Sequence, residues 1–171
     1  MIGRLFLSAA AACIGLAVPG FADEAAVTVH AVTTDGIGDP VGELSFSDTE
    51  FGLLIEPSIE GIEPGLHGMH VHQNPDCGPR EHEGKIVAAG AAGDHIDPAG
   101  TGTHAGPYGD GHLGDLPNLV VEDDGTATLP VLAPRVTVAD LEGRALVLHA
   151  GPDRYDDEHS GGDRAYCGVI E

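Results

Sequence analysis

Short apolar runs, separated by Gly, Pro and Asp, recur along most of the chain and predict β-strands. In several runs apolar and polar residues alternate, which places the apolar side chains on one face of a strand. Long helical periodicity is absent, and only 136–144 can hold one turn of helix. The pattern predicts an all-β antiparallel sandwich or barrel with eight strands, at 26–32, 41–47, 51–56, 66–72, 118–122, 126–132, 145–150 and 165–170.

Two gaps between the predicted strands, 73–117 and 151–164, are too long to be hairpin turns. Loops of that length are usually functional or disordered. The first gap contains four histidines, and the second directly follows the strand that ends near His149. Because residues that can bind metals gather there, the sequence favours two long functional loops over disorder.

Length and charge narrow the class of protein. The chain has 171 residues, which suits one domain with a core of its own. Asp and Glu number 28, against 7 Lys and Arg. A nucleic-acid partner is therefore not expected, because phosphate binding depends on a basic surface.

The N-terminal segment MIGRLFLSAAAACIGLAVPGFA has the features of a secretory signal peptide. We predict a signal peptide at 1–22, cleavage after Ala22, and a mature domain at 23–171 in the periplasm or outside the cell. The apolar run 5–18 is shorter than the roughly 20 residues that span a membrane, so stable insertion of the mature chain is not expected. A lipid-bearing Cys13 is the alternative, although few apolar residues precede it.

Removal of 1–22 leaves two cysteines, Cys77 and Cys167. In an exported protein the oxidising compartment favours a disulfide bond between them. Two buried free thiols are the alternative.

The stretch GLHGMHVHQNPDC, at 65–77, carries the first candidate metal ligands. If His70 and His72 lie on one strand, their side chains share a face, and His67 points to the other side. His149, at the end of another predicted strand, could supply a third nitrogen. Imidazole ligands suit copper, zinc, iron and nickel, so the metal stays open at this point.

A second candidate set follows in the long loop. It comprises three histidines and one carboxylate, a combination that suits a closed tetrahedral zinc site: His95, His104, His112 and Asp115.

At these motifs the chain resembles the copper-zinc superoxide dismutases, and especially their exported bacterial type. The resemblance covers nearly the whole mature chain and rests on five motifs in family order: GLHGMHVHQNPDC, GKIVAAGAAGDHIDP, GHLGDLP, GRALVLHAG and GGDRAYCGVI. It implies a Greek-key arrangement of the eight strands. It also implies copper and zinc as cofactors.

The resemblance implies a role for each candidate residue. His70, His72, His95 and His149 would bind copper, and His95, His104, His112 and Asp115 would bind zinc, so that His95 bridges both metals. Asp153 would hold one copper histidine and one zinc histidine. His67 corresponds to a framework histidine, and His30, His82 and His159 match no ligand motif, so we expect these three at the surface.

The implied reaction converts superoxide to oxygen and hydrogen peroxide by copper redox cycling, with His95 transferring a proton. Arg164 would dock the substrate anion beside the copper. A surface arginine paired with Asp163 is the alternative. One departure from the family is the short, acidic stretch RYDDEHSGGD (154–163), which lies where an anion should approach.

The cations of the mature chain are few. Arg80, Lys85, Arg154 and Arg164 fall in the two long loops, which also contain twelve acidic residues, whereas Arg135 and Arg144 are expected elsewhere. The resemblance is compatible with a homodimer. Two other functions fit parts of the pattern, a non-catalytic copper or zinc carrier and a zinc hydrolase, but four protein ligands on zinc argue against the hydrolase.

Overall fold

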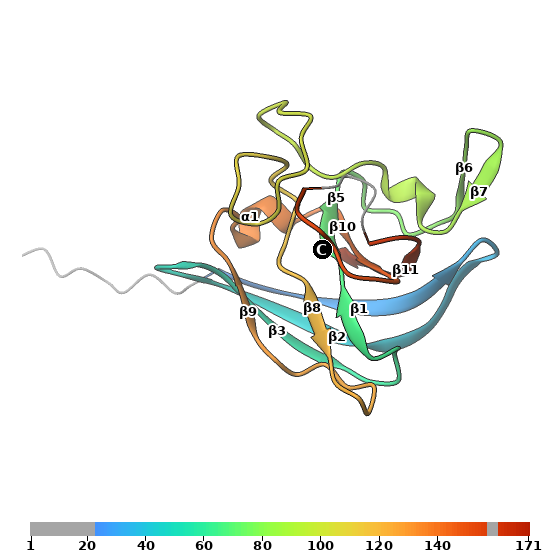
Figure 1. Cartoon of the computed structure of the whole chain (residues 1–171), viewed down its shortest axis with the longest axis horizontal. Coiled ribbons are helices and arrows are strands. Elements are labelled where there is room, and N and C mark those ends of the chain that lie inside the picture. Colours follow the sequence, from blue (N-terminus) through green and yellow to red (C-terminus); the bar gives the residue numbers. More distant parts are fainter. Residues whose placement is uncertain (1–22, 157–160) are drawn as a thin grey trace, which may run out of the picture.

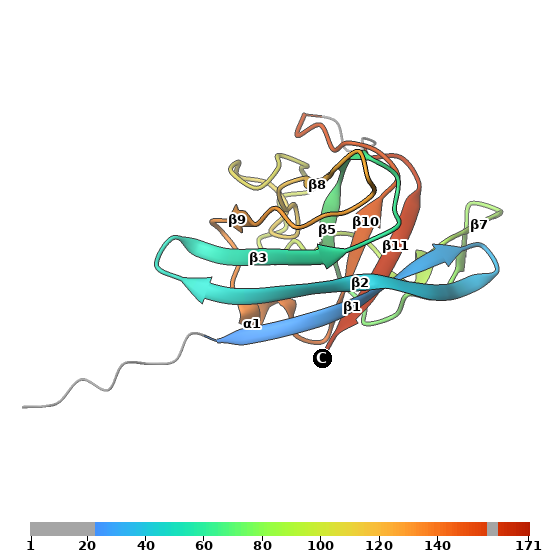
Figure 2. The ribbon, with the colours of Figure 1, turned by 90° about the horizontal axis from the view of Figure 1, so that it is seen from below.

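A computed structural model describes residues 23–156 and 161–171. The largest sheet in this part of the chain has seven antiparallel strands in the order β5-β10-β11-β1-β2-β3-β9. The sheet curls into a half-barrel (Figure 2). Its strands are β1 (Glu24–Thr33), β2 (Gly36–Thr49), β3 (Gly52–Ile59), β5 (Met69–His72), β9 (Val131–Ala133), β10 (Arg144–His149) and β11 (Arg164–Ile170).

The concave side of the sheet holds the main hydrophobic core. Alternate residues of the first strands point inward, among them Val27 and Val29 of β1 and Leu44 and Phe46 of β2, all at most 2% exposed. A small sheet of β4 (Gly65–His67) and β8 (Leu119–Val121) contributes Leu119 to the same core. The alternation read from the sequence thus follows the pleat of the strands.

Each of the eight predicted strands has a counterpart, and three of them differ most in extent. β2 begins at Gly36, earlier than predicted, because Gly36 and Ile37 pair with the end of β1. The predicted strand 66–72 divides at Gly68, whose N–H and carbonyl bond to the loop after β10 and to His149. The predicted strand 126–132 shrinks to β9, and Ala127 makes only an isolated bridge to Ile59.

The single predicted turn of helix is present as α1 (Val138–Leu141). A capping box starts it: the Thr137 side chain bonds to the backbone of the first turn, and Asp140 bonds back to the N–H of Thr137.

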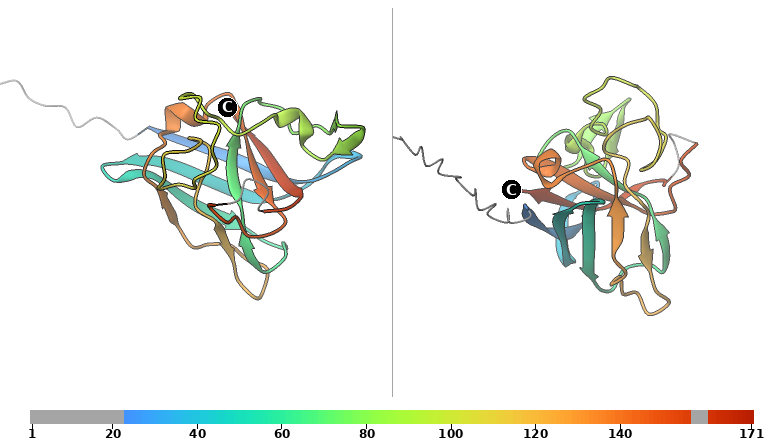
Figure 3. Two further views of the ribbon diagram at one scale, coloured as in Figure 1. Left: turned by 45° about the horizontal axis from the view of Figure 1, so that its top comes forward. Right: turned by 90° about the vertical axis from the view of Figure 1, so that its left-hand side faces the viewer.

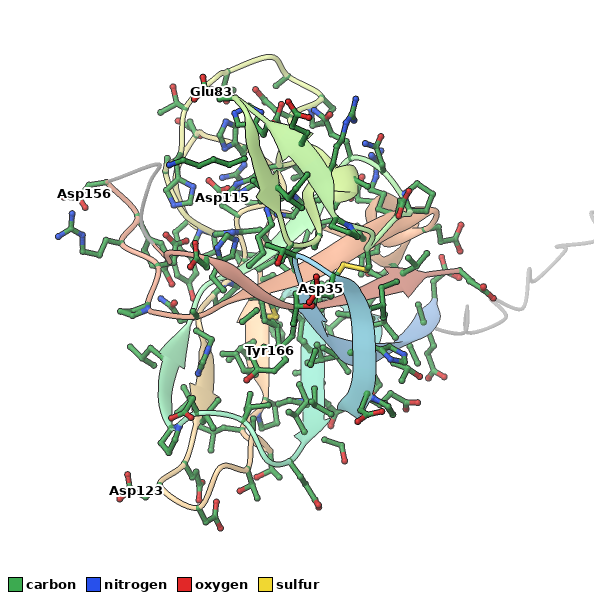
Figure 4. The ribbon with its side chains drawn as sticks, turned by 90° about the vertical axis from the view of Figure 1, so that its right-hand side faces the viewer. Asp35, Glu83, Asp115, Asp123, Asp156 and Tyr166 are labelled. Atoms are coloured by element: carbon green, nitrogen blue, oxygen red, sulfur yellow. A yellow bond between two sulfur atoms is a disulfide. The ribbon has the colours of Figure 1, made fainter. Side chains whose placement is uncertain are left out.

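The long segment 73–117 lies at one end of the sheet (Figure 1) and contains more structure than expected. A hairpin of β6 (Arg80–His82) and β7 (Lys85–Val87) turns at Glu83 and Gly84, both with positive φ, and a 3-10 helix η1 (Gly90–Ala92) follows. The predicted disulfide is confirmed: Cys77 is bonded to Cys167 of β11, which attaches this segment to the sheet (Figure 4).

Within the described residues, no helix is long and apolar enough to cross a membrane. The predicted signal peptide, its cleavage site and Cys13 lie outside the described residues.

Candidate metal centre

Strand β5 positions the first two histidines. His70 and His72 are on one face of it, at most 1% exposed, and their cross-strand partners on β10 are Val147 and Ala145. His149 ends β10, so its ring reaches the same region. Isolated bridges pair His72 with His95 and His70 with Asp115, and these bridges fix the long loop against β5.

Two groups of potential ligands result. In the first, His70, His72, His95 and His149 each offer one ligand atom, and all four atoms lie within 4.8 Å of one another. In the second, the same holds for His70, His95, His104 and Asp115. His70 and His95 belong to both groups, and their ring centroids are 4.1 Å apart. The residues predicted from the sequence therefore converge on one place.

His112 is outside the compact second group but contacts the same carboxylate. The Nδ1 atoms of His95, His104 and His112 lie 2.8, 3.0 and 3.4 Å from the Asp115 oxygens. Ligands at about 2.0 Å on a tetrahedral zinc ion are about 3.3 Å from one another. Each of the three histidines therefore lies about as far from Asp115 as two ligands of one zinc ion lie from each other. In Figure 4, Asp115 lies among blue ring nitrogens at the end of the molecule opposite Asp123.

Among the described residues, five buried ring nitrogens make no hydrogen bond, although two of them, those of His104 and His112, face the Asp115 carboxylate. Buried polar atoms are nearly always satisfied, and leaving five unsatisfied in one place would be costly. All five belong to residues of the two candidate ligand sets, so the site fits two metal ions. The nitrogens are His70 Nδ1, His72 Nε2, His104 Nδ1, His112 Nδ1 and His149 Nε2.

The opposite nitrogens of four of these rings are held by acceptors. Asp153, buried, accepts from His70 Nε2 at 2.8 Å with one oxygen and from His104 Nε2 at 2.9 Å with the other. The Nδ1 atoms of His72 and His149 donate to backbone carbonyls. Such contacts fix the tautomer and leave the unpaired nitrogen free to bind a metal.

Asn118 in turn holds Asp153. Its side-chain oxygen accepts the N–H of Asp153 at 2.8 Å, and its side-chain nitrogen donates to the Asp153 carbonyl at 3.0 Å. Nothing in the sequence singled out Asn118, because its role depends on the approach of the loop after β10.

Burial and charge divide the histidines by pKa. Burial lowers the pKa of His70 to about 3, and it also lowers the pKa of His72 and His149. The carboxylates Asp115 and Asp153 raise the pKa of His104 to about 10. Burial alone would raise the pKa of Asp115, but the neighbouring imidazoles of His104 and His95 outweigh it and lower that pKa. His70, His72 and His149 are thus neutral at pH 7, whereas His104 is charged.

A cavity of about 670 Å³ opens onto both groups, and Arg164 lines it together with His95 and His149. The guanidinium of Arg164 donates to the carbonyl oxygens of Ala89 and Gly93, both at 2.8 Å, on either side of η1. Asp94 and Asp97 line the same cavity. The cavity therefore has one held guanidinium beside the histidines and two carboxylates that oppose it.

The other histidines that the structure describes lie apart from the groups. His67 is buried, but its ring nitrogens contact the carbonyl oxygens of His149 and Glu63, so neither is free to bind a metal. His82 is exposed and His30 is half-buried beside Gly38. His159 is outside the described residues.

The comparisons with known proteins agree with this geometry. Residues 41–170 match the family model of copper/zinc superoxide dismutase. The chain belongs to the copper/zinc superoxide dismutase family. It is 47% identical to "Superoxide dismutase [Cu-Zn] 1" of Salmonella typhimurium over 151 residues. This match covers 85% of each of the two chains.

Solved structures of the family resemble the fold. The Cu/Zn superoxide dismutase from Brucella abortus is 43% identical, with a TM-score of 0.84 over 87% of this chain and 100% of that one. The monomeric enzyme from Salmonella enterica is 44% identical, with a TM-score of 0.77 over 87% of this chain and 100% of that one. As a copper/zinc superoxide dismutase, the protein uses copper and zinc to convert superoxide to oxygen and hydrogen peroxide.

Proposed function

We propose that the two groups of side chains divide the metals of this dismutase between them. Copper is bound by His70, His72, His95 and His149, and zinc by His95, His104, His112 and Asp115. The observation that supports this division is the set of five buried, unpaired nitrogens distributed over both groups. His70 and His95 both belong to the two groups, but Asp153 holds one ring nitrogen of His70, so His95 is the residue that we assign to both metals.

The chemistry follows from this division. When bound, copper supplies one-electron redox chemistry, whereas zinc has none and contributes charge and structure. The Nδ1 atom of His95 is on the zinc side, 2.8 Å from Asp115. Its Nε2 atom is therefore left for the copper side, where it holds a proton between the two half-reactions and delivers it to the peroxide.

Arg164 docks superoxide in this proposal. Its two carbonyl contacts hold the guanidinium at the cavity wall but leave some of its five N–H groups for an anion. No contact between Arg164 and Asp163 is needed to place it, so the surface-pair alternative has no support among the described residues. Asp153 orients one ligand of each metal.

All these side chains come from one chain, and we propose that the single chain is the catalytic unit. The homodimer remains a prediction, and the similar enzyme from Salmonella enterica is monomeric. Sedimentation of the metal-loaded protein measures this directly.

We also propose export to the periplasm or the cell exterior after cleavage behind Ala22. The disulfide supports this location, since such bonds persist in oxidising compartments. Intact mass of the exported protein tests the cleavage. A mass that begins at a lipid-bearing Cys13 would contradict it.

Metal analysis of three proteins tests the division of ligands. We expect one copper and one zinc in the wild type, loss of copper with zinc retained in His149→Ala, and the reverse in His112→Ala. Superoxide-dismutating activity measured on the same samples separates an enzyme from a metal carrier. Loss of zinc instead of copper in His149→Ala would reverse the assignment.

A further inference from the structure

The loop that carries three of the proposed zinc ligands has little regular structure of its own. Residues 101–114, all of them described, form no strand or helix. They contain His104 and His112, and Asp115 follows directly. Backbone carbonyls in such a segment have few partners within it, although buried carbonyls need them. The shape of the loop must therefore come from contacts with other parts of the molecule.

Arg135 supplies such contacts. Its guanidinium donates to four backbone carbonyls of this loop, through Nη1 to Gly106 at 3.2 Å and to Gly109, and through Nη2 to Gly111 at 2.7 Å and to His112 at 3.1 Å. One of these carbonyls belongs to a proposed zinc ligand. Arg135 lies outside the two long loops in sequence, as predicted, but its side chain reaches one of them. No sequence signal could have shown this contact, because it depends on the tertiary approach of the loop.

The base of Arg135 is firmly held. It follows β9 at the edge of the large sheet and precedes α1, between the buried residues Ala133 and Val136. Gly52 packs so closely below that a Cβ there would lie 2.6 Å from Pro134. The loop, drawn in olive, lies beside α1 in two views (Figures 1 and 3).

Because β9 is an edge strand, the Arg135 contact joins the loop to one edge of the sheet. β5, which carries His70 and His72, is one end of the seven-stranded sheet, and β9 is the other. The loop bonds to β5 through Val71, which donates to the Gly114 carbonyl at 2.9 Å. Arg135 attaches the same loop to the β9 end, so the zinc ligands are suspended between the two edges of the half-barrel.

Arginine suits this task better than other side chains. Its planar guanidinium presents five N–H donors in a fixed fork, whereas the three donors of lysine radiate from a single atom. The four carbonyl oxygens also converge, so a cation is favourable there. A neutral side chain would remove the donor to Gly109 and Gly111, whereas the oxygens of Gly106 and His112 also accept backbone N–H groups.

We propose that Arg135 is a positioning residue for zinc: by collecting these carbonyls it sets the separation of His104, His112 and Asp115 before the metal arrives. The inference rests on the proposed zinc ligands. If the proposal holds, zinc affinity depends on the Arg135 side chain, which touches neither metal, and copper affinity does not.

The test compares Arg135→Met and Arg135→Lys with Arg144→Lys. Arg144 is a matched control because it also donates to a backbone carbonyl, that of Asp140 in α1, but makes no hydrogen bond to residues 101–115. Zinc and copper affinities are measured by chelator competition, and hydrogen exchange of residues 101–115 is followed in metal-free protein by mass spectrometry.

We expect zinc affinity to fall about 10- to 100-fold in Arg135→Met, the range for residues that orient metal ligands, and less in Arg135→Lys. Copper affinity and the Arg144→Lys values should stay within about twofold, while exchange at 101–115 accelerates in the Arg135 variants. If Arg135→Met does not fold, Arg135→Lys serves instead. A fall of at least threefold in its zinc affinity, with copper affinity unchanged, would support the proposal.

Unchanged zinc affinity in a folded Arg135 variant, or equal loss of both metals, would overturn the proposal. His112→Ala is measured alongside to separate the assignment of the zinc ligands from the positioning role of Arg135. If it keeps full zinc affinity, the ligand assignment fails; if it loses zinc while the Arg135 variants do not, only the positioning role fails.

Discussion

Replacing Cys77 and Cys167 together by alanine tests how far the disulfide supports both the fold and the site. The bond joins residues 90 apart in sequence. In the chain-entropy model a ring of about that length contributes roughly 4.6 kcal/mol at 25 °C, because the unfolded chain loses freedom. With a urea m-value of about 2 kcal/mol per molar, the unfolding midpoint should fall by about 2.3 M.

A local effect should accompany the global one. The bond anchors the segment that leads to η1, whose flanking carbonyls, at Ala89 and Gly93, hold Arg164. Release of this segment loosens the guanidinium, so azide should bind more weakly to the copper-loaded variant. Urea titration of metal-free protein measures the first effect, since bound metals would add to stability. Optical titration with azide measures the second.

Wild-type protein that has been unfolded, reduced and refolded in reductant is the control, and its midpoint should match that of the variant. A midpoint shift below about 0.5 M in both samples would refute the ring argument. Unchanged azide affinity would show that Arg164 is held without help from the disulfide.

Three further predictions concern the metals and the substrate. In His95→Ala, copper should stay bound through the three remaining histidines, but magnetic coupling to cobalt placed in the zinc site should vanish; persistent coupling would exclude His95 as the bridge. Zinc uptake by metal-free protein at pH 7 should release about one proton, because His104, with its pKa raised to about 10, must give up the proton that occupies its metal-binding nitrogen. The apparent zinc affinity should then rise about tenfold per pH unit between roughly pH 7 and 9, and calorimetry in buffers of different ionisation enthalpy should detect the proton; no release would contradict the charge state. Dismutation should slow as ionic strength rises, and Arg164→Ala should lower the rate and flatten this dependence, since screening weakens the attraction of the anion to Arg164; a rate that climbs with salt would mean that acids such as Asp94 and Asp97 dominate the cavity.

The strands were predictable because each buries alternate residues, and this alternation can be read from a few consecutive residues of the sequence. The limits of the prediction have local causes as well. Gly68 divides one predicted strand because its backbone bonds to the loop after β10 instead of continuing the ladder. The β6–β7 hairpin was missed although Glu83-Gly84, followed by Ile86 and Val87, is a turn signal, because the whole segment was treated as one loop.

The candidate ligands were predictable for a different reason: imidazole and carboxylate groups at these spacings have few other uses together. His70 and His72 required only the period of a strand. Arg135 and Asn118 could not be found in this way, since each acts on a segment far away in sequence through backbone atoms. Contacts with the main chain of a distant loop leave no pattern in the residues that make them.

The disulfide also gives the molecule a mechanical asymmetry. Tension applied to the two ends of the chain passes through the Cys77–Cys167 bond and bypasses everything between those residues. Strand β5 lies before Cys77 and is exposed to the pull, whereas the four proposed zinc ligands and His149 lie inside the covalent ring. Stretching or threading the oxidised chain would therefore strip His70 and His72 from the copper ion first and leave the zinc ligands enclosed in a loop that cannot be drawn out.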